Sequence, residues 1–324
     1  MNIIEIIQKF PTELDAIKHF EKSRWGKVVK CPFCKSESIG VRNKDYRFHC
    51  KNCNKSFSVT TNTQLHNTRM PLKTWLFAFS IISDAKKGLS ALQLQRNLNI
   101  SYPSAFAMYH KIRELMNFEN KKVILNDVTE VDSTYIGGKP RKYQYESKHT
   151  PFEIPKLDKL KEKYENKGFE FKEGEYKKPA KIGNQKRGKG TDKDIVTGVV
   201  ERGGDVFAEV VKNTNFNELK KIIDKHVNKN DSVLMMDKDT SNVKISKLID
   251  SIVIDHSKMY SYRGLNTNSI ESFWAIIKRQ IMGQHHHVNA KYLNSYVQET
   301  VFKYNNRKQD DMFETLVKFS MVTI

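Results

Sequence analysis

All four cysteines of the chain lie within one short stretch. Cys31 and Cys34 are separated by two residues, fifteen residues follow, and Cys50 and Cys53 repeat the two-residue spacing. Two such pairs can place four thiolates around one tetrahedral Zn²⁺ ion, and the stretch between them suits a β-hairpin. Because the protein fills all four positions, the predicted zinc is structural and leaves no place for a reacting water. Two disulfides or four unpaired thiols are the alternative interpretations.

Three acidic residues are candidates for a second kind of metal chemistry. Asp132 interrupts a β-branched and aromatic segment, Asp237 ends an apolar segment, and Glu271 lies early in a predicted helix. An unpaired buried carboxylate is costly, so its presence in a strand indicates a function or a buried partner. Carboxylates can hold two Mg²⁺ or Mn²⁺ ions about 3.5–4 Å apart, which activate an attacking oxygen and stabilise a leaving oxygen at phosphorus. The three acids therefore predict two-metal phosphodiester chemistry, provided that the fold brings them together.

The acids also have simpler interpretations. Asp237 could begin a turn, with Asp239 as the ligand in its place. Asn268-x-x-Glu271 fits a capping box, in which Glu271 only reaches back to the start of its own helix. Against this, helical spacing places Asn268, Glu271 and Lys278 on one stripe beside the apolar one, so that Glu271 and Lys278 could bind metal and DNA phosphate together. The apolar stripe is predicted to consist of Ile270, Phe273, Trp274, Ile277 and Ile281.

These residues need elements to hold them, and the hydrophobic periodicity predicts an α/β core. Strands are expected over Val128–Gly138, Ile195–Val200, Val206–Val211, Asp231–Asp237 and Ile252–Ile254, and helices over Asn215–Val227, Asn268–Met282 and Asn289–Asn305. Three strands, a helix and then alternating strands and helices are typical of an RNase-H-like fold. Neighbouring strand and helix ends converge in such a sheet, so acids far apart in sequence can meet there.

A second group of helices precedes this core. The periodicity predicts helices over Leu72–Ile82 and Ala91–Leu98, a turn at Asn99, and a longer helix that begins after Ser101. This order is typical of a helix-turn-helix, whose second helix enters the major groove of DNA. The candidate base-reading residues, all expected to be exposed, are Tyr102, Ser104, His110 and Lys111. A helical hairpin that only packs is the alternative interpretation.

The composition favours a polyanionic partner. Lysine and arginine number 56 against 37 acidic residues, which gives a formal net charge of +19. No apolar run approaches the roughly 20 residues of a spanning helix, and the first residues do not look like a signal peptide. We therefore expect DNA rather than a membrane as the partner, and a cytoplasmic, nucleoid-associated location if the protein is bacterial. Lys278 and its neighbour Arg279 are further candidate DNA contacts, with solvated charges as the alternative.

Three domains are expected. Residues 1–66 would hold an N-terminal helix and the zinc ribbon, residues 67–120 the helix-turn-helix, and residues 121–324 the catalytic domain. The stretch 141–193 reads as a basic insertion, because residues 139–193 contain 17 lysines and arginines against nine acidic residues. Consecutive histidines rarely chelate one ion well, so His285, His286 and His287 are expected to contact DNA or the core.

The sequence resembles insertion-sequence DDE transposases of the ISXO-like group, which are related to the Merlin transposases. The matching stretches follow the family's order over nearly the whole chain. They are Cys31-Pro-Phe-Cys34 with Cys50-x-x-Cys53, Met70-Pro71-Leu72-x-x-Trp75, Lys87-Gly88-Leu89-Ser90-Ala91, Val131-Asp132-x-Thr134-Tyr135-Ile136-Gly137-Gly138-Lys139, Thr267-Asn268-Ser269-Ile270-Glu271-Ser272-Phe273-Trp274, and Gly283-Gln284-His285-His286-His287. The specific stretches are Tyr135-Ile136-Gly137-Gly138 and Asn268-x-Ile270-Glu271-x-Phe273-Trp274, whereas the cysteine spacing alone is not specific.

The resemblance implies an RNase-H-like fold and Mg²⁺-dependent DNA cleavage and strand transfer at terminal inverted repeats. It carries the metal-ligand role onto Asp132, Asp237 and Glu271, with Asn268 as a substitute or helper because some members of the group use asparagine third. Joining two DNA ends implies at least a homodimer on DNA.

The sequence departs from the family pattern at two positions. Ser133 stands where an acid is usual, and Asp255 stands where asparagine is common. Neither change removes a candidate ligand, but both leave full activity open. A catalytically silent DNA-binding regulator and a cellular nuclease of the same fold are the alternative functions.

Overall fold

The computed structural model describes residues 1–324 except 43–44, 138–143, 146–178, 181–192, 238–239, 255–265, 310 and 324. By its internal contacts the chain forms two units, one of Met1–Ile136 with Asp194–Ile324 and one of Gly137–Lys193. The second unit contributes the antiparallel pair β5 (Gln144–Tyr145) and β6 (Pro179–Ala180). The predicted basic insertion at 141–193 therefore lies almost wholly outside the described residues.

A three-stranded antiparallel sheet follows the first two helices of the larger unit. Its strands are β1 (Ile39–Arg42), β2 (Arg47–Cys50) and β3 (Ser56–Phe57), in the order β1-β2-β3. Its core holds only Cys31, Phe48, Cys50 and Phe57, with Trp25 packed against them. A core of this size is too small to stabilise a module by itself. The fold of this sheet therefore needs a further source of stability.

Six helices of the larger unit, joined by Phe302 of a later helix, share one hydrophobic core. They are α1 (Ile3–Lys9), α2 (Glu13–Trp25), α3 (Leu72–Asp84), α4 (Ala91–Leu98), α5 (Tyr102–Asn120) and α11 (Met312–Ser320). The predicted helix at 91–98 is confirmed, and it ends at Asn99 in the left-handed conformation (φ 51°, ψ 47°). Sequence reasoning expected one helix before the zinc ribbon rather than two, and it did not predict α11.

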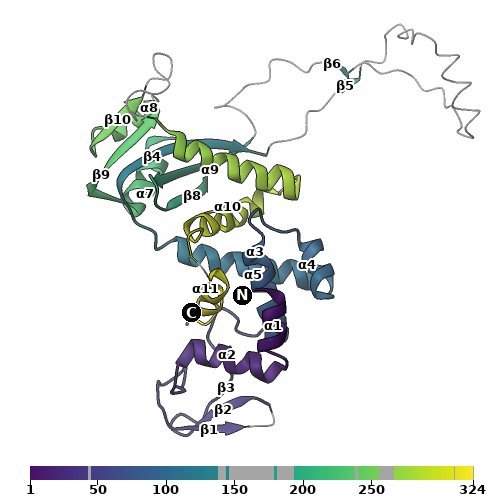
Figure 1. Ribbon diagram of the computed structural model, residues 1–324. Helices are drawn as coiled ribbons and strands as arrows, with labels where there is room; N and C mark the ends of the chain where they lie inside the picture. The colour runs from purple at the N-terminus through teal and green to yellow at the C-terminus, as the bar shows by residue number, and fades with distance from the viewer. Residues whose placement is uncertain are drawn as a thin grey trace, which may run out of the picture. The chain divides into compact units, whose positions relative to one another are not determined.

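A five-stranded mixed sheet forms the second half of the larger unit (Figure 1). Its strands are β4 (Leu125–Ile136), β7 (Asp194–Glu201), β8 (Val206–Val211), β9 (Val227–Asp237) and β10 (Ser251–Ile254), in the order β10-β9-β4-β7-β8. The strands β4, β7 and β8 pair antiparallel, whereas β4, β9 and β10 pair parallel. The predicted strands are thereby confirmed in place and order.

Helices cover both faces of this sheet. They are α7 (Phe216–His226), α8 (Thr240–Ile245), α9 (Asn268–Arg279), which continues into the π-helix η1 (Gln280–His285), and α10 (Ala290–Asn305). Alternate strand residues serve the two faces, since Val199 packs with α7 and α8, whereas Val196 and Val200 pack with α9 and α10. Figure 1 shows α9 and α10 running along one side of the sheet.

None of the helices in the described ranges combines the length and apolar character that membrane crossing requires.

Candidate metal centres and DNA-contacting residues

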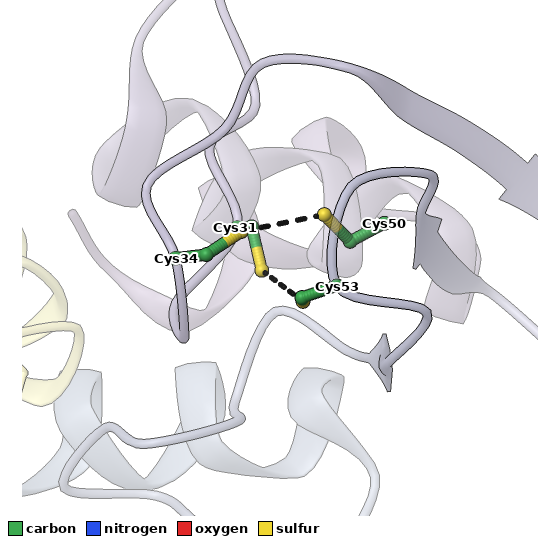
Figure 2. A group of neighbouring side chains, drawn as sticks. All are labelled: Cys31, Cys34, Cys50 and Cys53. Atoms are coloured by element: carbon green, nitrogen blue, oxygen red, sulfur yellow. Dashed lines mark hydrogen bonds between the residues drawn. The ribbon is translucent and has the colours of Figure 1, made fainter.

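The four cysteines converge on one point between two loops (Figure 2). The Sγ atoms of Cys31 and Cys53 are 3.7 Å apart, those of Cys34 and Cys50 are 3.5 Å apart, and all four lie within 4.8 Å of one another. A disulfide would bring two sulfurs to about 2.05 Å, so the disulfide alternative is wrong. Tetrahedral Zn²⁺ with bonds of about 2.3 Å separates its sulfur ligands by roughly 3.8 Å, which this cluster matches.

The two cysteine pairs are built by the same local turn. The N–H of Lys35 donates to the carbonyl of Cys31, and the N–H of Asn54 donates to the carbonyl of Cys50. Both Lys35 and Asn54 have positive φ, 64° and 54°. Backbone N–H groups, led by that of Cys53, also lower the pKa of the Cys50 thiol to about 6. These turns explain why the two-residue spacing alone suffices to place the sulfurs.

Asp132 lies in the middle of β4, on the face that α9 covers. Its Oδ2 accepts a hydrogen bond of 3.0 Å from Nε1 of Trp274. Burial raises the pKa of the Asp132 carboxyl, and the charges of Glu271 and Asp237 raise it further, while hydrogen bonds from Ser133 and Trp274 act in the opposite direction. The three predicted ligands are therefore close enough for Asp132 to interact with both other charges.

A glycine makes room for the indole that holds Asp132. Gly198 of β7 lies opposite Asp132 in the strand register. A Cβ atom on Gly198 would lie 2.8 Å from Cη2 of Trp274, closer than real side chains allow. The absence of a side chain at position 198 thus permits the Trp274 ring to lie against β7 while its N–H reaches the carboxylate.

The helix α9 presents the predicted faces. The residues predicted to form its apolar stripe are all buried: Ile270, Phe273, Trp274, Ile277 and Ile281. Asn268, Glu271 and Lys278 are all exposed. The predicted capping box is wrong, because Thr267 rather than Asn268 precedes the helix, and Glu271 Oε1 accepts from the Thr267 hydroxyl at 3.2 Å. Asp237 is exposed at the end of β9.

The carboxylates do not form as tight a cluster as the cysteines. Within the described ranges, Cys31, Cys34, Cys50 and Cys53 are the group of candidate ligands whose donor atoms all lie within 4.8 Å of one another. Two ions about 3.5–4 Å apart spread their carboxylates over more space than one ion does. The assignment of Asp132, Asp237 and Glu271 as ligands stays a prediction, and Asp239 and Asp255 lie outside the described residues.

Sequence reasoning missed Glu130, which lies two residues before Asp132 and so on the same face of β4. Its side chain is 0% exposed. The carboxylate accepts hydrogen bonds from Ser269, Ile270 and Arg202. The available signal was an acid two residues before Asp132, which strand alternation places on the same face as Asp132.

The candidate base-reading residues of α5 differ in accessibility. Tyr102 is 47% exposed, the Ser104 hydroxyl accepts from Ser101 at the start of the helix, and Lys111 forms a 3.3 Å ion pair with Glu114. The expectation that all four residues are exposed holds for Tyr102 and is wrong for Ser104, His110 and Lys111, which are partly buried. The His110 ring is half-buried because α10 packs against this side of α5, and it lies among the rings of Phe106, Tyr292 and Tyr296.

A basic cavity of about 580 Å³ lies beside the C-terminal half of α9. Its charged lining residues are Lys86, Lys87, Arg279, Lys303 and Arg307, with Asp84 as the acidic member. Lys303 and Arg307 have protein partners, since Lys303 contacts Glu299 and Arg307 donates to the carbonyl of Gly204. Arg279, a predicted DNA contact, is exposed at this cavity.

A buried ionic network joins α5 to α10. Glu299 is 0% exposed and accepts from Arg113 (2.9 Å), Lys303 (2.7 Å) and the hydroxyl of Tyr109 (2.6 Å). These partners lower the pKa of the Glu299 carboxyl to about 2 despite its burial. His285 packs against Tyr296, as expected for a core contact, whereas His286 and His287 are exposed.

Two family profiles match the chain. One is described as an ISXO2-like transposase domain and matches residues 168–305, and the other is described as a transposase zinc-ribbon domain and matches residues 11–56. The first match includes Asp237 and Glu271 but begins after Asp132, and the second contains all four cysteines.

Individual relatives are distant. An uncharacterized protein in the transposable element ISH50 of Halobacterium salinarum is 25% identical over 135 residues, which cover 40% of this chain and 44% of that protein. Among solved structures, the Mos1 strand transfer complex matches at 10% identity and a TM-score of 0.21, covering 75% of this chain and 76% of that one. The Mos1 mariner paired end complex with Mn matches at 11% identity and a TM-score of 0.20, covering 74% and 76%.

TM-scores this low carry no weight for the fold, so the assignment depends on the two profiles, supported by the ISH50 relative. Both profiles describe transposase domains, and they match in the order in which the zinc ribbon and the mixed sheet occur along the chain. The chain therefore carries an ISXO2-like transposase domain, preceded by a transposase zinc-ribbon domain.

Proposed function

We propose that the protein binds the terminal inverted repeats of a mobile DNA element and catalyses Mg²⁺-dependent DNA cleavage and strand transfer. The catalytic domain would be RNase-H-like, with Asp132, Asp237 and Glu271 as the metal ligands and Asn268 as a helper. The sheet order β10-β9-β4-β7-β8, with three antiparallel and three parallel-paired strands sharing β4, supports this fold.

One observation carries the catalytic proposal. Burial is the main cause that raises the pKa of Asp132, and the charges of Glu271 and Asp237 raise it further, although the three residues come from α9, β9 and β4. Two further negative charges beside the buried Asp132 carboxyl are unfavourable in a purely structural cluster, and divalent cations relieve that repulsion. An acidic group assembled from three separate elements is the donor set that two-metal phosphodiester chemistry requires.

The residues of the chain would have distinct tasks in this reaction. Divalent ions bound at the acids would supply the activated oxygen and the charge stabilisation at phosphorus. Trp274 holds the Asp132 carboxylate in one orientation through its N–H. Lys278 and Arg279, exposed along α9 beyond Glu271, would contact the phosphates of the DNA strand.

DNA recognition would use the N-terminal half of the chain. Tyr102 and Lys111 of α5 are the accessible candidates for groove contacts, with Ser104 close to the helix start. The zinc ribbon would add contacts to the phosphate backbone of the DNA, in keeping with the net charge of +19 of the chain. Because strand transfer joins two DNA ends, we expect a homodimer or larger assembly on DNA.

The test is a DNA cleavage assay on the end sequences that flank the coding region, with Mg²⁺ or Mn²⁺. We expect Asp132→Asn, Asp237→Asn and Glu271→Gln each to reduce cleavage on the order of 10³-fold or more. Asp231→Asn is the matched control, because Asp231 lies in the same strand as Asp237 and pairs only with Asn228 among the described residues. DNA binding, measured without divalent ions, should be unchanged in all four variants.

A wild-type protein that binds the ends but cleaves no better than Asp132→Asn would contradict the enzymatic proposal. The protein would then be a DNA-binding regulator derived from a transposase. Cleavage that is independent of the end sequences would instead indicate a cellular nuclease.

A further inference from the structure

Glu130 is fully buried beside the proposed metal ligands, but its own oxygens are already occupied. Oε1 accepts from the Ser269 hydroxyl (2.9 Å) and from Nε of Arg202 (2.7 Å). Oε2 accepts from the backbone N–H groups of Ser269 (2.7 Å) and Ile270 (3.0 Å). A carboxylate offers about four acceptor positions, so these four donors leave Glu130 none for a metal ion.

Three of these four donors belong to the first turn of α9, directly before Glu271. The first N–H groups of a helix lack partners within the helix and carry its positive dipole end. In α9 the residue before the helix, Thr267, provides no side-chain cap. Glu130 takes over this role from a strand that is distant in sequence, so the start of α9 is fixed to β4 by two backbone hydrogen bonds.

Arg202 extends the connection to the segment before the helix. Its Nε donates to Glu130, and its Nη2 donates to the carbonyl (2.6 Å) and side-chain oxygen (3.3 Å) of Asn266. The Asn266 side chain in turn accepts the N–H of Asn268 at 3.2 Å. The β7–β8 turn, β4 and the approach to α9 are thereby linked through one guanidinium group.

This arrangement acts on geometry more than on stability. A buried ion pair gains little over well-packed apolar residues of the same volume, because both charges must be desolvated. What the pair provides is direction, since a carboxylate and a guanidinium group form hydrogen bonds of defined geometry. Glu271 lies on the same helical turn as the fixed N–H groups, so any shift of this turn along β4 moves it relative to Asp132.

We propose that Glu130 and Arg202 are positioning residues that hold the first turn of α9 against β4, so that Glu271 and Asp132 can bind the same pair of divalent ions. This inference depends on the proposed function. Neither residue is a metal ligand, and both act through the placement of Glu271.

The experiment compares Glu130→Gln and Arg202→Lys with wild type and with Glu201→Gln. Glu201 is the matched control, because it is a partly buried glutamate in the adjacent strand β7 that accepts one backbone N–H, from Asn126, and does not contact α9. Three quantities are measured: Mn²⁺ binding by electron paramagnetic resonance, the Mg²⁺ concentration for half-maximal cleavage, and the amide exchange of Ser269 and Ile270.

Both variants should bind Mn²⁺ more weakly, and need more Mg²⁺ for half-maximal cleavage, by about 10- to 100-fold. Excess Mn²⁺ should partly restore cleavage by Glu130→Gln but not by Glu271→Gln, since a displaced ligand can still bind and a missing one cannot. Amide exchange at Ser269 and Ile270 should accelerate in Glu130→Gln, while Glu201→Gln behaves as wild type. If Glu130→Gln does not fold, Arg202→Lys decides, because its partly exposed side chain keeps its charge and loses its paired contacts.

The inference is overturned if a folded Glu130→Gln has the Mn²⁺ affinity and Mg²⁺ dependence of wild type. If Glu130→Gln is unfolded, the same result in Arg202→Lys overturns it. The proposed function stands in either case. A wild-type protein that shows no metal-dependent cleavage would remove the proposed function and this inference together.

Discussion

The zinc ribbon and the proposed carboxylate site draw their candidate ligands from the chain in opposite ways. The four thiol ligands come from two copies of one local turn, both within the stretch 31–53, and their sulfurs lie within 4.8 Å of one another. The acids Asp132, Asp237 and Glu271 come from two strands and a helix, and Asp132 interacts with the other two charges across the sheet. One site is formed by local sequence, and the other is formed by the fold.

The difference shows which interactions stabilise the fold of each region. The ribbon has a core of four buried residues, so an ion must contribute much of its stability. Buried contacts such as those of Glu130 connect β4 to α9 at the proposed carboxylate site, so we expect this region to fold without an ion. Disturbing one region should therefore leave the other largely intact.

Removal of zinc should have the largest effect, and only on the ribbon. Structural zinc sites contribute apparent binding free energies of about 10–16 kcal/mol, so chelation or Cys34→Ser should unfold residues near 31–57. Amide exchange by mass spectrometry should show loss of protection in β1–β3 and unchanged protection in β4, β7 and β9. Equal loss in the five-stranded sheet would break the comparison.

Loss of the Glu299 charge should have the second-largest effect, and it should destabilise the contact between α5 and α10 rather than the zinc ribbon. Glu299→Gln leaves Arg113 and Lys303 buried without a countercharge, which costs about 3–5 kcal/mol of unfolding free energy. Glu314→Gln is the control, because the Glu314 side chain is 28% exposed and contacts only His19 by charge within the described part of the chain. Urea denaturation measures both, and similar values for the two variants would contradict this expectation.

Two separate glycine substitutions, compared with each other, should show a smaller effect on stability together with an effect on cleavage. In Gly198→Ala the new methyl group would meet the Trp274 ring, so we expect a cost of about 1–3 kcal/mol and weaker support of Asp132. Cleavage should fall about 10-fold or more. Gly40→Ala in β1 is the control, since its nearest atom lies 3.8 Å away, an ordinary contact. If both substitutions leave cleavage unchanged, the position of Trp274 has no influence on the proposed catalytic site.

The smallest expected effect is a pH dependence at the α5–α10 contact. Burial lowers the pKa of His285 from 6.5 to about 4, so the folded state stays neutral where the unfolded chain takes up a proton. Stability should therefore fall as the pH drops from 6.5 toward 4, and less steeply in His285→Gln. Thermal unfolding across this range measures the difference, which should disappear above pH 6.5. Identical slopes would show that His285 is not the group responsible.

The sequence predicted what depends on short spacing or on periodicity. The cysteine cluster, the positions of the five strands along the chain and the buried stripe of α9 are as expected, because two-residue and helical repeats determine them locally. His110 could not be judged in this way. Its burial follows from α10, whose aromatic residues lie about 180 positions later in the chain.

The function of Glu130 was hidden for the same reason. Its sequence neighbours explain nothing about it, because all its partners come from the turn after β7 and the start of α9. The capping box at Asn268 failed because a carboxylate from another strand already serves those N–H groups. Long-range partners thus explain the burial of His110, the role of Glu130 and the failure of the capping box.

Anomalous diffraction from crystals grown with Mn²⁺ tests the two-metal site most directly. The expected result is two Mn²⁺ peaks about 3.5–4 Å apart, with Asp132 between them and with Asp237 and Glu271 each bound to one. If crystals at saturating Mn²⁺ show no anomalous peak at Asp132, or show peaks only at acids elsewhere on the surface, the two-metal site is contradicted.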